Sequence, residues 1–292
     1  MFDETKGRQE IDGFGAALTG SSVHVLITDL DDNQRASLLK DLFDPSEGIG
    51  IKYLRLTMGA SDFSLADYTY NDQPPGQTDP TQSEFTLGFD QQDMIPLLQQ
   101  ILAINPDLKI MGTPWSAPAW MKDNNNLRNG GSLQNSFYAS YALYFVRYIE
   151  AMASAGISIH AVTMQNEPLV GTAYPSMEVS PEQQIVFIRD HLGPAFEAAD
   201  INTKIIVYDH NWDRPDYPLT VLGDAGARQF IAGSAFHCYA GDKGVMQEVQ
   251  NAYPEKGIYF TECSGGDFAP DFADNLSWNS RNLIIGAVRN SA

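Results

Sequence analysis

Short apolar runs recur along the chain, and each is followed by a longer stretch whose apolar residues are spaced as on one face of a helix. This alternation predicts parallel strands joined by crossover helices, so the expected fold class is α/β. We predict seven strands, near Ile11–Leu18, Ile51–Thr57, Leu108–Thr113, His160–Gln165, Lys204–Tyr208, Gly233–His237 and Gly257–Thr261.

Several local signals place the helices between these strands. Ser180 is a capping residue followed by Pro181, which favours a helix start at this point. Asn105-Pro106 and Tyr253-Pro254 should end the two helices that precede them. The aromatic and aliphatic stripe of Phe137–Met152 is typical of a helix packed on a sheet.

A parallel sheet of this kind is either open and doubly wound or closed into an eight-stranded barrel. A dinucleotide fingerprint fails in Gly13–Leu18, because Leu18 stands where the third glycine is needed. In barrels, polar residues gather at the carboxyl ends of many strands. Here such residues are Arg55, Asp62, Trp115, Asn166, Glu167, Asp209, His210, His237, Tyr239 and Glu262. We therefore predict a (β/α)8 TIM-type barrel, incomplete because only seven strands precede Ala292.

Two connections are unusually long, Ser61–Phe89 and Ser116–Ser136. Loops of this length in a compact domain often form the walls of an active site. No second domain is evident, so residues 1–292 are expected to be one barrel domain that is truncated at its C-terminal end.

The chain is acidic, with 18 Lys and Arg residues against 37 Asp and Glu residues and a formal charge of −19. Such a charge repels phosphate backbones and anionic lipid, which argues against nucleic acid and acidic membranes as partners. No apolar stretch approaches the ~20 residues of a membrane helix, and the N-terminus lacks the apolar segment of a signal peptide. We expect a soluble chain without stable membrane insertion.

The two cysteines, Cys238 and Cys263, are too few for a disulfide scaffold and lack zinc-site spacing. Each follows a candidate site residue, His237 or Glu262, so strand alternation should turn both outward as core thiols. His237 has no second histidine at ligand spacing. We expect neither a metal nor another cofactor.

Two strands end in glutamate, at Asn166-Glu167-Pro168 and at Thr261-Glu262. Glycosidic hydrolysis needs one carboxylic acid to protonate the leaving oxygen and one carboxylate to attack or stabilise the sugar cation. Glu167 and Glu262 lie on the fourth and seventh predicted strands, which would face each other across a barrel. A separation of about 5–5.5 Å would predict a retaining mechanism, and about 6.5–9.5 Å an inverting one.

Neighbouring strand ends supply further candidate contacts. Arg55 is expected to pair with Glu262, and Tyr239 to donate a hydrogen bond to Glu262. The alternative is a buried ion pair of Arg55 with Asp62, and both pairs could form at once. Asn166 would contact a sugar hydroxyl. Trp115 and Trp120 could stack on sugar rings or pack in the core.

Together these motifs resemble glycoside hydrolase family 30, the glucosylceramidase and endo-β-1,6-glucanase family, from about Ile11 to the end of the chain. The resemblance rests on Asp12-Gly13-Phe14-Gly15-Ala16-Ala17-Leu18-Thr19, Leu54-Arg55-Leu56, Ser61-Asp62-Phe63-Ser64, Pro114-Trp115-Ser116-Ala117-Pro118-Ala119-Trp120-Met121-Lys122, Gln165-Asn166-Glu167-Pro168, His237-Cys238-Tyr239 and Thr261-Glu262. It implies Glu167 as acid/base, Glu262 as nucleophile, and Arg55, Asp62, Trp115, Asn166, His237 and Tyr239 as substrate-binding residues.

The resemblance also implies a barrel joined to a β-sandwich, with a tryptophan on the eighth strand, and neither flank is present in this sequence. It implies a secreted full-length protein that acts on β-glucan or glucosyl lipid. Trp120-Met121-Lys122 and Asn129-Gly130-Gly131-Ser132-Leu133 are more similar to the microbial β-1,6-glucanases. The alternatives are an inactive sugar-binding remnant of such an enzyme and a metal-dependent barrel enzyme, for which clustered ligands are not evident. The sequence leaves the oligomeric state open.

Overall fold

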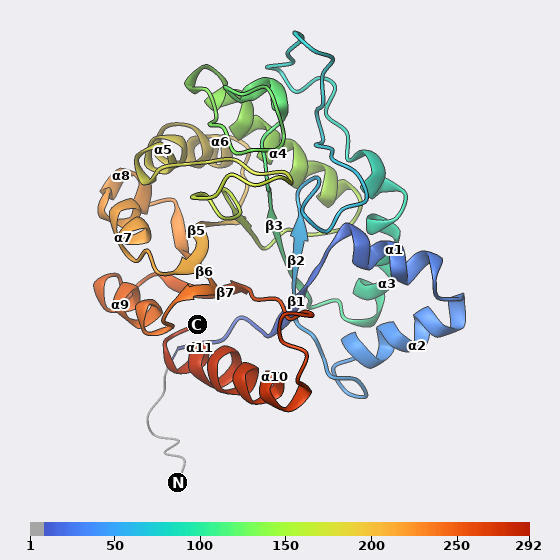
Figure 1. Ribbon diagram of the computed structural model, residues 1–292. Coiled ribbons are helices and arrows are strands. Elements are labelled where there is room, and N and C mark those ends of the chain that lie inside the picture. Colours follow the sequence, from blue (N-terminus) through green and yellow to red (C-terminus); the bar gives the residue numbers. More distant parts are fainter. Residues whose placement is uncertain (1–8) are drawn as a thin grey trace.

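The computed structural model describes residues 9–292 and contains one seven-stranded parallel sheet (Figure 1). Its strands follow one another in chain order: β1 (Gly15–Leu18), β2 (Tyr53–Thr57), β3 (Lys109–Thr113), β4 (Ala161–Thr163), β5 (Lys204–Trp212), β6 (Ile231–Gly241) and β7 (Gly257–Glu262). All seven predicted strands are confirmed. Within the described residues β1 and β7 each pair on one side only, so the sheet is an incomplete (β/α)8 barrel.

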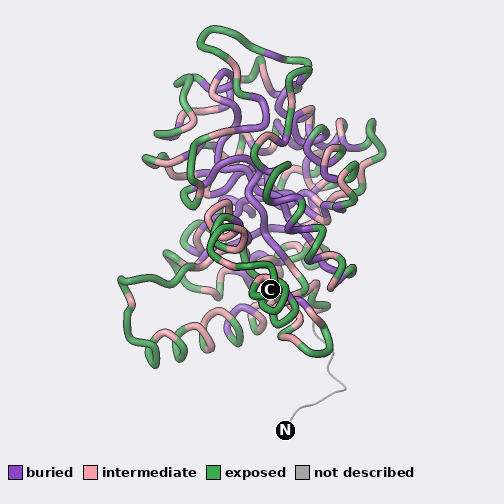
Figure 2. The backbone as a smooth tube through the Cα atoms, turned by 90° about the vertical axis from the view of Figure 1, so that its right-hand side faces the viewer, coloured by how far each residue is buried: buried purple, intermediate pink, exposed green. Residues whose placement is uncertain are grey.

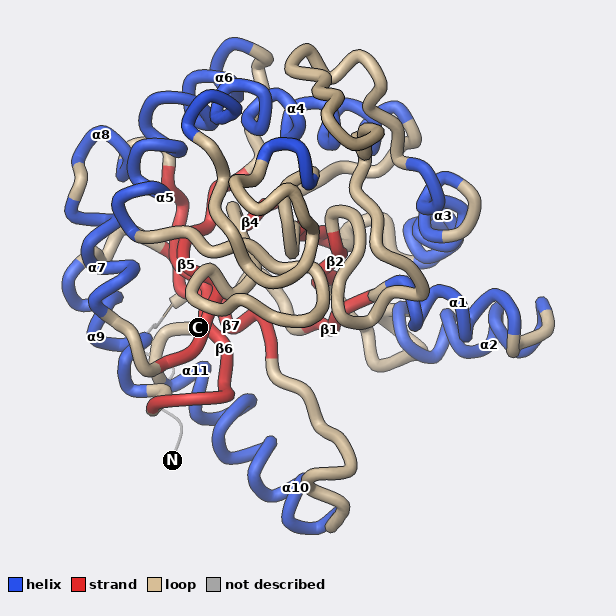
Figure 3. The backbone as a smooth tube through the Cα atoms, turned by 45° about the horizontal axis from the view of Figure 1, so that its top comes forward, coloured by secondary structure: helices blue, strands red, loops and turns tan. Residues whose placement is uncertain are grey.

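Helices surround the outer face of this curved sheet (Figure 3). The α-helices are α1 (Gly20–Thr28), α2 (Asp32–Phe43), α3 (Met94–Ile104), α4 (Tyr138–Ser154), α5 (Pro181–Phe187), α6 (Gly193–Ala198), α7 (Asp216–Gly223), α8 (Ala225–Arg228), α9 (Gly244–Ala252), α10 (Phe272–Asn279) and α11 (Ala287–Arg289). Short 3-10 turns are η1 (Gly88–Gln91), η2 (Ala119–Met121) and η3 (Asn135–Phe137), and π-helical segments are η4 (Ile188–Leu192) and η5 (Ser280–Gly286). α10 and the loop after β7 project from the ring of helices (Figure 3).

The helix boundaries follow the signals in the sequence. Ser180 caps α5 through a capping box with Gln183, and Pro181 occupies the first turn. α3 ends at Ile104 and α9 ends at Ala252, each two residues before a proline. The predicted aromatic helix is α4, which buries ten of its side chains.

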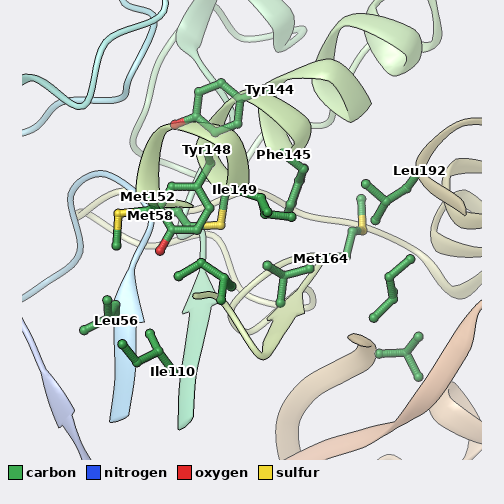
Figure 4. Close-up of a cluster of buried hydrophobic side chains, with 14 of the residues drawn as sticks. Leu56, Met58, Ile110, Tyr144, Phe145, Tyr148, Ile149, Met152, Met164 and Leu192 are labelled. Carbon is green, nitrogen blue, oxygen red and sulfur yellow. The ribbon is translucent and has the colours of Figure 1, made fainter. Parts of the chain in front are cut away.

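Most of the core lies between the sheet and its helices, and the buried residues fill the middle of the molecule (Figure 2). Tyr148 of α4 faces β2 and β3 near Leu56 and Ile110 (Figure 4), whereas Tyr138, Tyr141 and Phe145 pack against Phe187 of α5. Gly112 on β3 is needed there, because a Cβ atom would stand 2.8 Å from the ring of Tyr148. The close approach fixes the distance between α4 and the centre of the sheet.

A polar cluster occupies the amino-terminal ends of the strands. The carboxylate of Asp12 accepts hydrogen bonds from Lys109 and, at 3.1 Å, from both Lys204 and Tyr259. His160 also lies 3.5 Å from Asp12. These contacts join the starts of β3, β5 and β7 at the end of the sheet opposite to Glu167 and Glu262.

The long loops after β3 and β4 are locked together by a buried lysine. Lys122 is fully buried and its Nζ donates to the carbonyl oxygens of Asn126 at 2.6 Å, Leu127 at 3.2 Å and Ser176 at 2.7 Å. Arg128 extends the connection to the β2 loop through an ion pair with Asp67. These loops therefore form one continuous wall.

Candidate active site

Glu167 lies just beyond the end of β4, in an unusual backbone conformation. Its φ angle is +46°, a left-handed value that costs free energy for a residue other than glycine. Its backbone N–H donates to the carbonyl of Asp209 at 3.0 Å, and its side chain is 16% exposed. The backbone of Glu167 is therefore strained, and this conformation holds its carboxyl group at the carboxyl-terminal ends of the strands, called here the mouth of the sheet.

Glu262 is directed to the same place by an irregularity in β7. Pairing along β6 and β7 runs from Phe236 with Phe260 to His237 with Glu262, so Thr261 is an extra residue. Tyr259 and Thr261 both reach inward, toward Asp12 and Asp209 respectively. Regular alternation would then turn Glu262 outward, and the bulge corrects this.

Glu262 is held by two side chains, as the sequence predicts. Arg55 Nη1 donates to Oε2 of Glu262 at 2.8 Å, and the hydroxyl of Tyr239 donates to Oε1 at 3.0 Å. Arg55 is buried and its second ion pair is with Asp209, at 3.0 Å. Among the described residues Asp62 is not one of its ion-pair partners, so the predicted alternative pair of Arg55 with Asp62 is wrong.

Asp209 organises the site, although the sequence singled it out only as a polar strand end. Its fully buried carboxylate accepts hydrogen bonds from four side chains on four different strands: Arg55 at 3.0 Å, Thr163 at 2.8 Å, His237 at 3.0 Å and Thr261 at 2.6 Å. Burial raises the pKa of Asp209, but Arg55 and His237 outweigh it and hold that pKa well below its usual range.

His237 connects Asp209 to Glu167. Its Nε2 lies 3.0 Å from Asp209 and its Nδ1 lies 3.1 Å from Oε1 of Glu167. Burial alone lowers the pKa of His237, whereas its hydrogen bonds to Asp209 and Glu167 raise it to about 9. The imidazole is therefore charged at neutral pH and donates to both carboxylates.

The contact with His237 also changes the pKa of Glu167. Burial raises the pKa of Glu167, but the hydrogen bond and positive charge of His237 lower it by more, so the net pKa falls below the usual value. Glu167 is therefore ionised at neutral pH in this arrangement. Proton donation by Glu167 is favoured at acid pH.

The remaining predicted residues divide between the site and the core. Asn166 accepts a hydrogen bond from Arg55 Nη2 at 2.8 Å, and Trp115 packs 4.9 Å beneath the same guanidinium. Asp62 is exposed at the mouth, where desolvation and the charge of Glu262 raise its pKa. Trp120 belongs to the core, since its ring meets Phe137 edge-on and Nε1 donates to a backbone carbonyl.

Tyr174 joins these residues without having been predicted. It lies on the loop after β4, and desolvation together with the charges of Glu167 and Asp62 raises the pKa of its phenol. Its only signal in the sequence is its position on a long loop shortly after Glu167. The loop after β4, which is part of this wall, thus places the phenol of Tyr174 close enough to Glu167 and Asp62 to be affected by their charges.

The prediction that both cysteines are free core thiols is wrong. Cys238 and Cys263 form a disulfide with their Cα atoms 5.4 Å apart. Both side chains turn outward as predicted, but β6 and β7 are neighbours in a register that sets the two residues side by side.

One group of possible metal ligands is present among the described residues. Glu167, His237 and Glu262 offer ligand atoms that all lie within 4.8 Å of one another. The raised pKa of His237 disfavours such a role, because a metal ligand must be a neutral imidazole. Absence of a metal stays a prediction. In the described part of the chain, no helix is both long and apolar enough to cross a membrane.

Comparisons with known proteins agree with this geometry. Residues 11–284 match the family model described as the glycosyl hydrolase family 30 TIM-barrel domain. An endo-1,6-β-D-glucanase of Aspergillus fumigatus is 41% identical over 274 residues, which cover 88% of this chain and 55% of the relative. The lysosomal acid glucosylceramidase of Mus musculus is 31% identical over 287 residues, covering 93% and 55% of the two chains.

A solved structure shows the same arrangement. The structure of an endo-β1,6-glucanase superimposes with a TM-score of 0.94 at 35% identity, and the match covers 99% of this chain and 66% of the other. The chain spans a little over half the length of the two curated relatives.

Proposed function

This chain belongs to glycosyl hydrolase family 30, and we propose that it provides the catalytic barrel of a retaining β-glycosidase that cleaves β-linked glucose. One observation carries the mechanism: an oxygen of Glu167 and an oxygen of Glu262 lie within 4.8 Å of each other. Retaining enzymes place their carboxyl groups about 5–5.5 Å apart, whereas inverting enzymes leave about 6.5–9.5 Å for a water molecule.

In the first step Glu262 is the nucleophile and Glu167 the general acid. Arg55 and Tyr239 orient the two oxygens of Glu262, so that one attacks the anomeric carbon. Glu167 gives its proton to the leaving oxygen, and the bond between that oxygen and the anomeric carbon breaks. The product of this step is a glucosyl ester of Glu262 and a free hydroxyl on the leaving group.

In the second step Glu167 acts as general base. It takes a proton from a water molecule that attacks the anomeric carbon, and Glu262 leaves as a carboxylate. His237 donates a hydrogen bond to Glu167 and stabilises the carboxylate that this step requires. Asn166, Trp115, Asp62 and Tyr239 are proposed to contact the glucose unit.

The substrate is proposed to be β-1,6-glucan, with a glucosyl lipid as the alternative. The relatives at about 40% identity are named endo-1,6-β-D-glucanases, and glucosylceramidases are more distant at about 30%. We propose that the described part of the chain is one catalytic domain, which the single sheet and the one large hydrophobic cluster support. The Cys238–Cys263 disulfide supports an exported protein, since disulfides persist mainly in oxidising compartments.

The test compares the chain with its Glu167→Gln and Glu262→Gln variants on an aryl β-glucoside whose leaving group is activated. Such a leaving group needs little acid assistance, so glycosylation should survive loss of Glu167 and collapse with loss of Glu262. Glu197→Gln, an exposed carboxylate on α6, is the matched control. The first-formed sugar should be the β-anomer.

A folded chain that binds glucan but never turns over would contradict the proposal and favour the sugar-binding alternative. An α-anomer as first product would contradict the retaining mechanism while leaving hydrolysis intact. Comparison of β-1,6-glucan with a glucosyl lipid, under equal conditions, decides between the two substrates.

A further inference from the structure

The Cys238–Cys263 disulfide lies directly beside the two residues that the proposed mechanism needs most. Cys238 follows His237 on β6, and Cys263 follows Glu262 at the end of β7. His237 and Glu262 are themselves paired across the two strands. The covalent bond thus joins the strand carrying the histidine to the strand carrying the nucleophile, one residue beyond each.

β7 has few other restraints at this point. Within the described residues it pairs with β6 alone, and the register between them is already shifted at His237. Residues 264–268 after the disulfide are all exposed. A strand end with one partner, a bulge and an exposed loop is a place where ladder hydrogen bonds open readily.

We propose that the Cys238–Cys263 disulfide is a positioning element for Glu262 and His237, and that it makes catalysis sensitive to thiol reductants. The proposal rests on the retaining mechanism given above. Glu262 is only 25% exposed and touches Arg55 and Tyr239 at 2.8 and 3.0 Å, so a small movement of the strand end breaks both contacts. Catalytic groups lose most of their effect when displaced by about 1 Å.

Reduction is chemically straightforward. A dithiol such as dithiothreitol attacks the disulfide and becomes a cyclic disulfide, while Cys238 and Cys263 each gain a proton as thiols. Both cysteines are partly accessible, so a small dithiol can reach them without unfolding of the chain. The reduced form keeps every catalytic side chain but loses the covalent restraint on β7.

The experiment measures the chain in oxidised and dithiothreitol-reduced forms, with Cys238→Ser/Cys263→Ser as a permanently open variant. Peptide mapping without reductant first verifies the bond. Hydrogen exchange should then accelerate in residues 258–262 after reduction, with residues 161–163 of β4 as an internal control. Turnover of the aryl β-glucoside at a temperature where all forms are folded should fall at least about tenfold, mainly in kcat.

The pH profile separates positioning from simple stabilisation. If reduction releases His237 from Glu167, the alkaline limb of kcat/KM on β-1,6-glucan, whose leaving oxygen must be protonated, moves to higher pH, and reoxidation restores it. A bond that only stabilises the fold would lower Tm and leave kcat and this limb unchanged, which would overturn the proposal. The double serine variant must not respond to dithiothreitol; a response would overturn the assignment to these cysteines.

The exchange measurement needs no turnover. The oxidised chain could be inactive while hydrogen exchange in β7 still accelerates on reduction. That result would refute the proposed function, but it would leave the effect of the disulfide on β7 in place. Unchanged exchange in an active chain would refute the positioning role alone.

Discussion

Nε2 of His237 lies 3.0 Å from the carboxylate of Asp209, and both side chains are fully buried. A charged imidazole buried in this way is stable only because a carboxylate faces it. The other ring nitrogen faces Glu167 at 3.1 Å. Asp209 therefore holds the positive charge of His237 beside Glu167, although its carboxylate forms no hydrogen bond with Glu167 itself.

Asp209→Asn should disable the site more severely than its distance from the substrate suggests. The change leaves Arg55 and His237 with one buried negative charge fewer, and breaking a buried ion pair costs about 3–5 kcal/mol. We expect kcat/KM on an aryl β-glucoside to fall at least about a hundredfold, with a clear loss of Tm. Activity near that of the parent chain would show that Asp209 is dispensable.

His237→Asn should move the pH dependence of the reaction in a defined direction. The hydrogen bond and charge of His237 lower the pKa of Glu167 against the opposite effect of burial. Without them the pKa of Glu167 rises, so Glu167 stays protonated to higher pH. On β-1,6-glucan, whose leaving oxygen must be protonated, the alkaline limb of kcat/KM should shift to higher pH while the maximum rate falls, and an unchanged or downward-shifted limb would refute the contact.

Much of the fold was predictable because it depends on local patterns. All seven strands and the cap at Ser180 follow from apolar periodicity and helix-start chemistry. The two glutamates were found because each ends a strand in a barrel-like pattern. Arg55 and Tyr239 were found because each is a polar residue near the end of a predicted strand, on β2 and β6 respectively.

Two features depend on information that periodicity does not contain. β5 continues to Trp212 with left-handed backbone at Tyr208 and Asp209, and this turn buries Asp209 in the centre of the site. The disulfide depends on the bulge at Thr261, which shifts β7 by one residue and brings Cys263 beside Cys238. Neither a bulge nor a left-handed pair of residues leaves a mark in the spacing of apolar residues.

Asp12 should contribute to stability in a pH-dependent way without affecting turnover. Burial raises the pKa of Asp12, but Lys109 and Lys204 lower it well below its ordinary value of 3.8. The stabilisation is therefore complete above that value and is lost as pH falls toward the lowered folded-state pKa. Asp12→Asn should cost about 1–2 kcal/mol at neutral pH, discounted for partial exposure, and less in acid.

Urea unfolding of both proteins at several pH values measures this difference. The expected signature is a gap between the two unfolding free energies that narrows as pH falls. Because the cluster lies at the opposite end of the strands, kcat of Asp12→Asn should equal that of the parent chain. A gap that is independent of pH would mean that packing, and not charge, accounts for the loss.

Lys122→Met should loosen the wall formed by the loops after β3 and β4. The substitution keeps the length of the side chain but leaves the carbonyl groups of Asn126, Leu127 and Ser176 without their donor. A buried acceptor without a partner costs about 1–3 kcal/mol, and relaxation of the loops toward water limits the total to about 2–4 kcal/mol. Hydrogen exchange should rise in residues 126–133 and 172–178.

The pH dependence of that loss provides a second, independent test. Burial lowers the pKa of Lys122 to about 7 in the folded chain, against 10.5 for an exposed lysine. Between these values the unfolded chain binds more protons, so this group makes folding more favourable as pH rises. In Lys122→Met, the unfolding free energy from urea titrations should rise less steeply with pH between these values. Lys52→Met removes an exposed lysine and should keep the steeper rise with pH. If both variants keep the same dependence of the unfolding free energy on pH, Lys122 has the pKa of an ordinary lysine. Its three hydrogen bonds would then raise that pKa as much as burial lowers it.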